Sequence, residues 1–309
     1  DNRRQRQMCI RDRFITLLMI EIFKYSKNQK DIHLMKAAFF VAIGFLLKGL
    51  TIIAIGGMVA LIYFIYQKKI SIFLKIIFNF KAWAIFLIVI APWFLLFARE
   101  IGIEELNYLF FGQTFGRFTN TFEKHDGPIY YYFIIFIFVV FPYLIDSLKG
   151  MLRLNLRHND LEAFLFLWFM FVLVFFSLSS TKLPHYLLYG ITPIAFFIAK
   201  NHKYIKDQNL NILSSCFHIF LWLTVLALPF YLSYLAEVRE SFEVSITKIL
   251  EFEEDSSYLI FAFSMILFFV IGILLKFNLL LAKRISSIAL VVALSTKIIP
   301  FINESTQSD

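Results

Sequence analysis

The sequence predicts an all-α membrane protein, a polytopic bundle of helices that crosses the bilayer about nine times. Of its 309 residues, 60% are hydrophobic and forty are phenylalanine, whereas a soluble domain is roughly half apolar. Several apolar runs approach the ~20 residues that cross a hydrocarbon core of ~30 Å. Basic and acidic connecting segments alternate along the chain, as expected when inner loops are rich in Lys and Arg.

The first apolar segments are predicted as short helices that meet at turns. Residues 14–23 are too short to cross alone, and the lysine-rich residues 24–36 are placed inside. Residues 37–66 would form one helix of ~45 Å, which is too long for one crossing. A mid-membrane Lys48 would cost ~3 kcal/mol or more. Because the next segment is also basic, residues 37–66 are predicted as two helices with an outer turn at Lys48-Gly49.

The same charge alternation places the later crossings. The loop of residues 67–81 and the loop that contains Lys149, Arg153 and Arg157 are basic and inside, whereas the acidic residues 99–127 and 236–257 are outside. Residues 179–186 form a tight outer turn. The predicted crossings are residues 82–98, 129–148, 161–178, 187–199, 212–235, 258–275 and 285–301.

Residues 1–13 differ in composition from the rest of the chain. They have neither an initial methionine nor the apolar core of a signal peptide. We interpret them as an artefact joined to a truncated reading frame; a basic cytoplasmic tail is the alternative. Residues 14–309 are then a transmembrane region without its N-terminal helices.

Several chemistries are excluded by the motifs. The two cysteines form no disulfide framework or CxxC metal motif. The chain has no GxxxxGKS/T, HExxH or GxSxG motif, so no nucleotide or organic cofactor is expected. The net charge of +8 would suggest nucleic-acid binding in a soluble chain. Here topology explains that charge, and no nucleic-acid partner is expected.

Two cations in different outer segments are candidate phosphate ligands. Lys48 could bind a phosphate, with Gly49 allowing close approach, or it could snorkel from a helix end. Arg117 offers a planar fork suited to phosphate or carboxylate. Its alternative role is an interfacial anchor between two phenylalanines.

The segment HDGPIYYY adds a histidine and tyrosines where the chain re-enters the membrane. His125 could be a metal ligand or a proton carrier, or a solvated loop residue. Tyr130 and Tyr131 could contact a sugar or lipid. An aromatic belt at the membrane interface is the alternative.

The turn at residues 179–186 contains a lysine, a histidine and a tyrosine, which a connection between two helices does not require. Lys182 and Tyr186 lie four residues apart and would converge on one ligand if a helix begins at Pro184. His185 is a further candidate for contact with sugar or lipid; a decorated hairpin turn is the alternative. Because topology places these groups on one side, the sequence predicts an outer site for an anionic, lipid-linked ligand.

Five motifs resemble the polyprenyl-phosphate-sugar-dependent glycosyltransferases of the GT-C type, in the family's order and spacing over about residues 37–200. The most similar branch is the lipid A 4-amino-4-deoxy-L-arabinose transferases and the related protein O-mannosyltransferases. The resemblance implies a GT-C-like fold in the bacterial inner membrane, with a periplasmic active face. It implies transfer of a pentose or hexose from polyprenyl phosphate to a lipid or protein acceptor. The motifs are FLLKGLTII, APWF, FFGQTFGRF, HDGPIYYY and SSTKLPHYLLYGITP.

The resemblance also implies roles for residues that match the motifs. Lys48 and Lys182 would bind the donor phosphate, with Tyr186 beside it. Arg117 would order its loop or contact the leaving phosphate. His125 matches a metal ligand of the arabinose-transferring branch, which implies a divalent metal.

The sequence departs from the family in two places. Leu50 stands where the family has a proline after Lys-Gly. The family's catalytic acid lies in the first outer loop, and we expect that loop to be missing here. A general base must deprotonate the acceptor hydroxyl, so no catalytic residue is assigned and the polypeptide alone is expected to be inactive.

A transporter or flippase for a lipid-linked anion is the alternative function. Transporters commonly have repeated halves and place polar groups near the midplane. Here the candidate charges lie at helix ends and no internal repeat is visible, which favours an enzyme. A membrane scaffold, the third hypothesis, does not explain the Lys-Leu-Pro-His-Tyr turn.

Overall fold

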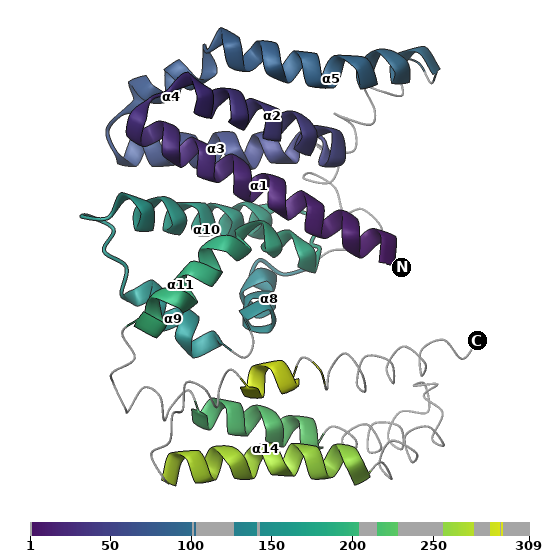
Figure 1. Cartoon of the computed structure of the whole chain (residues 1–309), viewed down its shortest axis with the longest axis vertical. Coiled ribbons are helices and arrows are strands. Elements are labelled where there is room, and N and C mark those ends of the chain that lie inside the picture. Colours follow the sequence, from purple (N-terminus) through teal and green to yellow (C-terminus); the bar gives the residue numbers. More distant parts are fainter. Residues whose placement is uncertain are drawn as a thin grey trace. The chain divides into compact units, whose positions relative to one another are not determined.

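The computed structural model is helical, and the residues that it describes contain no strand (Figure 1). They fall into two compact units, Asp1–Phe141 with Ser147–Lys200, and Pro142–Asp146 with Asn201–Asp309. The described residues are 2–100, 102, 127–140, 143–203, 215–227, 256–274, 285–290 and 292.

Most of the labelled helices belong to the first unit. In the second unit, α14 spans Ser256–Leu274 and a shorter apolar helix spans Ser215–Ala227. The other helices are α1 Asn2–Asn28, α2 Asp31–Lys48, α3 Thr51–Tyr66, α4 Ile70–Ile77, α5 Phe80–Glu100, α8 Tyr131–Val140, α9 Leu144–Leu152, α10 Asp160–Leu178, the 3-10 helix η2 Pro184–Gly190 and α11 Ile191–Lys203.

The predicted break in residues 37–66 is confirmed, because α2 ends at Lys48 and α3 begins at Thr51. Gly49 has a φ of 70° and a ψ of −146°, a backbone conformation that glycine adopts without steric cost. A Cβ at Gly44 would lie 2.1 Å from Ile52 Cδ1. The two helices therefore pack closely on either side of the turn.

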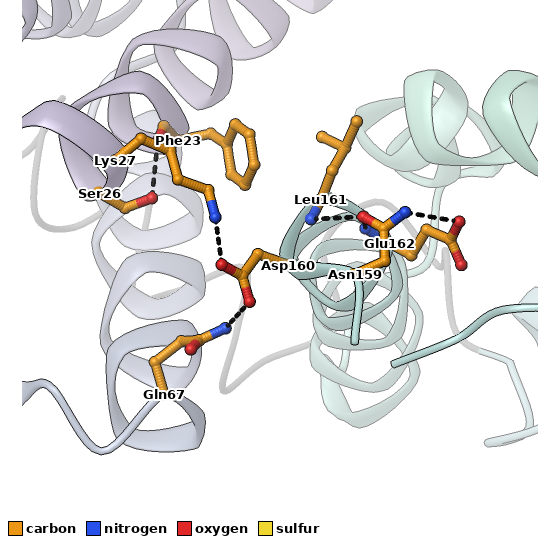
Figure 2. Close-up of polar contacts among 8 residues, drawn as sticks. All are labelled: Phe23, Ser26, Lys27, Gln67, Asn159, Asp160, Leu161 and Glu162. Atoms are coloured by element: carbon orange, nitrogen blue, oxygen red, sulfur yellow. Dashed lines mark hydrogen bonds and ion pairs between the residues drawn. The ribbon is translucent and has the colours of Figure 1, made fainter. Parts of the chain in front are cut away.

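Three segments that the charge pattern predicts on one side of the membrane meet in the structure (Figure 2). Lys27 at the end of α1 forms an ion pair with Asp160 at the start of α10. Gln67 Nε2, just after α3, donates to Asp160 Oδ1 at 2.8 Å. Tyr66 Oη donates to the Leu156 carbonyl, also at 2.8 Å. We call this the inner end of the first unit.

The start of α10 is capped by its own sequence (Figure 2). Asn159 Oδ1 accepts from the backbone N–H groups of Leu161 at 3.1 Å and Glu162 at 3.2 Å, which satisfies donors that a helix leaves unpaired. Asn159 Nδ2 in turn donates to Glu162 Oε1 at 2.9 Å. The buried Glu162 also accepts from the Asn155 N–H and pairs with Lys200 of α11.

Replacing Glu162 by glutamine is expected to lower the free energy of unfolding by about 3 kcal/mol, because the buried Lys200 ammonium loses its counterion. Chemical unfolding of the detergent-solubilised protein measures this loss. The matched control is Asp160→Asn, whose pairing partner Lys27 is 45% exposed. That exposed pair is expected to contribute about 1 kcal/mol or less. Equal losses would contradict the prediction.

The antiparallel packing of α3 and α10 defines the opposite end. Both helices start or finish at the inner end and contact each other. At ~1.5 Å per residue they extend ~24 and ~29 Å from it. The Lys48-Gly49 turn and residues 179–186 therefore lie at the same, opposite end, which we call the outer end.

Two helices in the described ranges are long and apolar enough to cross a membrane. They are α5 and α10, and they agree with the crossings predicted for residues 82–98 and 161–178. The apolar side chains of α5 point largely outward; Ile88 is 70% and Leu95 is 71% exposed. Lipid would cover this surface. The count of about nine crossings stays a prediction.

Three other predictions of local structure are wrong. Residues 129–148 form two helices, α8 and α9, rather than one, and a proline at position 142 cannot donate a helical hydrogen bond. The helix predicted from residue 187 begins at Ile191, after η2. Residues 67–81, predicted as a loop, contain α4.

The second unit contains parts of the last three predicted crossings. Trp222 Nε1 donates to Ser286 Oγ at 2.8 Å, and both residues are buried. The rings of His218 and Phe269 lie 5.4 Å apart. The acidic residues 236–257 lie mostly outside the described ranges.

The prediction that residues 1–13 are an artefact or tail stays a prediction; α1, which spans Asn2–Asn28, runs through them without a break.

Candidate functional site

Two segments that the sequence singles out lie in contact at the outer end. Tyr132 Oη accepts from the Leu183 N–H at 3.0 Å and donates to the Leu183 carbonyl at 3.1 Å. Tyr132 lies in α8 and is fully buried, whereas Leu183 lies between α10 and η2. The described part of HDGPIYYY and the Lys-Leu-Pro-His-Tyr turn are therefore in contact, whereas the ligand site predicted for them stays a prediction.

Lys182 is buried at the end of α10, with 6% of its surface exposed. Its Nζ donates to the carbonyls of Ser177 at 2.9 Å and Ser179 at 2.7 Å. The last carbonyls of a helix have no intrahelical partner, and the negative end of the helix dipole favours a cation there. Lys182 thus caps α10.

Among the described residues, the charge of Lys182 is only partly compensated. An ammonium group has three donors, of which the two carbonyls use two. No carboxylate within the described ranges forms an ion pair with Lys182. Burial lowers the pKa of the ammonium group below its ordinary value of 10.5. An anion that reached Nζ would stabilise the charged form.

Gly127, the first described residue of the HDGPIYYY motif, lies against this lysine. A Cβ at position 127 would lie 3.2 Å from Lys182 Cδ and 3.4 Å from Tyr131 Cδ2. The backbone at Gly127 therefore covers the stem of Lys182. The rings of Tyr131 and Tyr132 are edge-on at 5.1 Å, and Tyr130 is 58% exposed.

Tyr186 and His185 follow directly in η2, a 3-10 helix that begins at Pro184. The convergence of Lys182 and Tyr186 on one ligand stays a prediction. Tyr186 is buried, and its ring lies 4.7 Å from Phe176 and is stacked at 6.3 Å on Tyr189. Its ring is thus part of the aromatic packing on α10. His185 is half-buried and edge-on to Tyr186 at 4.8 Å.

The remaining predicted residues are placed less completely. Lys48 is the last residue of α2, at the outer end. Arg117 and His125 lie outside the described residues, so their predicted roles stay predictions. No group of three His, Cys, Asp or Glu side chains able to hold a metal occurs in the described part of the chain. The divalent metal also stays a prediction.

Tyr132 is the positioning residue that sequence reasoning did not assign. Three consecutive tyrosines at the start of a helix point in directions about 100° apart, so only some of them can face the bundle. The triple tyrosine was a visible signal, but it did not indicate which ring is buried. The carbonyl partners of Lys182 have no sequence signal, because every residue has a carbonyl.

Replacing Tyr132 by phenylalanine is expected to lower the free energy of unfolding by about 1–3 kcal/mol, because both backbone groups of Leu183 lose a buried partner. Thermal unfolding in detergent measures this. The matched control, Tyr130→Phe at an exposed position, is expected to change little. An unaltered unfolding temperature for Tyr132→Phe would show that this contact does not hold the turn.

A small cavity lies at the inner end, away from Lys182. Its volume is about 100 Å³, enough for several water molecules. Its lining residues are Ser26, Lys27, Tyr63, Phe64, Gln67, Lys69 and Asp160.

No family model matches the chain. Two curated proteins, each named as an undecaprenyl phosphate-alpha-4-amino-4-deoxy-L-arabinose arabinosyl transferase, are similar in sequence. The one from Photorhabdus laumondii is 32% identical over 161 residues, 51% of this chain and 28% of its own length. The one from Proteus mirabilis is 29% identical over 185 residues, 59% of this chain and 33% of its own length. This chain thus spans about a third of their length.

A solved structure is similar in fold. The crystal structure of ArnT from Cupriavidus metallidurans bound to undecaprenyl phosphate superposes with a TM-score of 0.73 at 14% identity. The match covers 91% of this chain and 51% of that one. The predicted resemblance is confirmed: the chain is similar in sequence to the undecaprenyl phosphate-aminoarabinose arabinosyl transferases and has the all-helical GT-C fold of ArnT.

Proposed function

We propose that the protein is a polyprenyl-phosphate-sugar-dependent glycosyltransferase. It moves 4-amino-4-deoxy-L-arabinose, or a related pentose or hexose, to lipid A or another lipid or protein acceptor. It acts on the periplasmic face of the bacterial inner membrane, which it crosses about nine times. This function would make it an enzyme of cell-envelope modification.

The buried cation at Lys182 is the observation that carries this proposal. It lies at the outer end, has one donor beyond its two carbonyl partners, and has no carboxylate partner in the described ranges. A phosphate monoanion or dianion supplies the charge and the acceptors that such a group needs. The names of the similar transferases, and the undecaprenyl phosphate bound to ArnT, support a polyprenyl phosphate.

In the proposed reaction, the acceptor hydroxyl oxygen forms a bond to the anomeric carbon while the bond from that carbon to the donor phosphate oxygen breaks. The leaving phosphate takes the bonding electrons and gains negative charge. Lys182 stabilises this charge electrostatically in a site of low dielectric. The hydroxyl proton passes to a general base, a role that we assign to no described residue.

The other predicted residues complete the proposed site. Lys48 and Arg117 add cations for the donor phosphate, and Tyr186 borders it. Lys48 is supported by its place at the same end as Lys182.

Sugar or lipid contacts are assigned to Tyr130, Tyr131 and His185. The role of Tyr131 is supported because the backbone at Gly127 lies close to both the Tyr131 ring and the stem of Lys182. The exposure of Tyr130 is compatible with contact to a ligand or to lipid. His125 remains the proposed metal ligand.

The transporter or flippase alternative has weaker support. The similar proteins are named as transferases, and Lys48 and Lys182 lie at helix ends rather than near the middle of a helix. Both observations favour chemistry at the outer surface.

The test is transfer by the purified full-length gene product in proteoliposomes. The donor is undecaprenyl phosphate-4-amino-4-deoxy-L-arabinose, the acceptor is lipid A, and mass spectrometry detects the added sugar. A parallel assay follows movement of labelled donor across the bilayer without acceptor. We expect transfer of the sugar. Donor movement without any transfer would overturn the proposal in favour of a flippase.

A further inference from the structure

The helix α4 lies at the inner end, between α3 and α5. Lys75 Nζ donates to Gln29 Oε1 at 3.2 Å. Just beyond α4, Asn79 Nδ2 donates to Asp31 Oδ1 at 3.3 Å, and Lys81 Nζ pairs with Asp31 Oδ2 at 2.7 Å. These contacts hold the segment of residues 67–81 against the turn between α1 and α2.

This short helix has two apolar faces. Ile72 is 7% exposed and packs against the protein. The second face does not pack against the protein. It carries Ile70, Leu74, Ile77 and Phe78, which are 44%, 48%, 40% and 79% exposed. Their spacing of four, three and one residues places them on one side of a helix. A contiguous exposed apolar surface at the end of a membrane protein fits acyl chains.

The segment itself carries charges of one sign, although Asp31 of α2 pairs with Lys81 and Asp160 of α10 lies near Lys69. Lysines occupy positions 68, 69, 75 and 81, and no acidic residue occurs between positions 67 and 99. Lys75 lies on the flank of the exposed apolar face. Trp83, which is 51% exposed, donates from Nε1 to the Ile77 carbonyl at 2.6 Å. Tryptophan is enriched where lipid meets water.

We propose that residues 67–81 form a binding site for anionic phospholipid of the inner leaflet. Acyl chains cover the exposed face of α4, while lipid phosphates pair with Lys68, Lys69 and Lys75. A basic amphipathic helix that lies in the membrane interface binds anionic lipid through its buried apolar area and through electrostatic attraction to the lipid headgroups. The site lies at the end opposite Lys182, so it is separate from the proposed donor site.

The test uses native mass spectrometry of the full-length protein in detergent. It is titrated with dioleoyl phosphatidylglycerol or with dioleoyl phosphatidylcholine, which differ only in the headgroup. We expect about a fivefold or larger preference for phosphatidylglycerol. The triple variant Lys68→Gln, Lys69→Gln and Lys75→Gln is expected to lose that preference and to keep its binding of phosphatidylcholine.

A matched control removes the same charge from another basic inner segment, through Lys149→Gln, Arg153→Gln and Arg157→Gln. This variant should retain the preference, since those residues do not flank α4. Leu74→Ser with Phe78→Ser should weaken the binding of both lipids. Unfolding temperatures check that each variant is folded.

The proposal is overturned if phosphatidylglycerol and phosphatidylcholine bind alike, or if both triple variants lose the preference equally. It is also overturned if inorganic phosphate displaces phosphatidylglycerol, because the site would then recognise an anion without a lipid. None of these outcomes depends on sugar transfer, so failure here leaves the proposed transferase function intact.

Discussion

Replacing Lys182 by methionine in the full-length protein is expected to weaken binding of undecaprenyl phosphate by about ten- to a hundredfold. Methionine preserves the apolar stem and removes the cation. A hydrogen bond to a charged group contributes about 1.5–3 kcal/mol, and each 1.4 kcal/mol changes affinity about tenfold. Binding is measured by titration of the detergent-solubilised protein with the lipid phosphate. Lys36→Met is the control, because Lys36 is exposed near the start of α2.

The same variant separates a phosphate-binding role from a structural one. Removing the buried ammonium relieves the cost of desolvating a charge. It also leaves the carbonyls of Ser177 and Ser179 without their donor, at a cost of about 1–3 kcal/mol. These effects oppose each other, so the unfolding temperature should change little while donor binding falls. Unchanged affinity for the lipid phosphate would refute the role proposed for Lys182.

The lowered pKa of Lys182 predicts how binding depends on pH. The ammonium form binds phosphate, and it is lost as pH rises through a pKa that burial holds below 10.5. Donor affinity should therefore fall with rising alkaline pH, and this dependence should be absent in Lys182→Met. In the ligand-free protein, the unfolded state binds more protons over this range. The free energy of unfolding should then rise with pH between the lowered pKa and 10.5.

Replacing Gly150 by alanine is expected to have the largest effect on stability, about 4 kcal/mol or more. A Cβ at this position of α9 would lie 1.8 Å from the Phe197 carbonyl oxygen and 2.5 Å from the carbonyl carbon. Both atoms are backbone of α11, and Phe197 is fully buried. The helices can approach this closely only because glycine has no side chain.

The measurement is the yield of folded protein and its unfolding temperature in detergent. Gly57→Ala is the matched control, since a Cβ there would meet no atom within 4 Å. Alanine is a better helix former than glycine by ~1 kcal/mol, so this control should be neutral or slightly stabilising. A folded Gly150→Ala protein as stable as the control would contradict the close packing of α9 on α11.

The positions of several helices could be predicted, because they depend on local composition. An apolar run of ~20 residues satisfies both the bilayer and its own backbone only as a helix. This reasoning located α5 and α10 and the break at Lys48-Gly49. It also grouped Lys27, Gln67 and Asp160 at one end, because topology follows the charges of the connecting segments.

The predictions that failed depend on tertiary context. Four lysines in a connecting segment predict a solvated loop for residues 67–81 on composition alone. Ile72 makes this segment a helix with a buried side only by packing against the protein. The hydrophobic length of residues 129–148 predicts one helix, because length alone does not show where α8 ends.

By itself, the sequence determined that this is a helical membrane protein with a cation-bearing outer turn, and it indicated the relatives to which the chain is similar. Only the tertiary structure decided that Lys182 is buried against the Ser177 and Ser179 carbonyls, and that Tyr132 holds the turn. The reason is physical. Hydropathy and charge are properties of neighbouring residues, whereas the burial of Lys182 depends on how segments pack together. Tyr132 pairs with a residue 51 positions away along the chain.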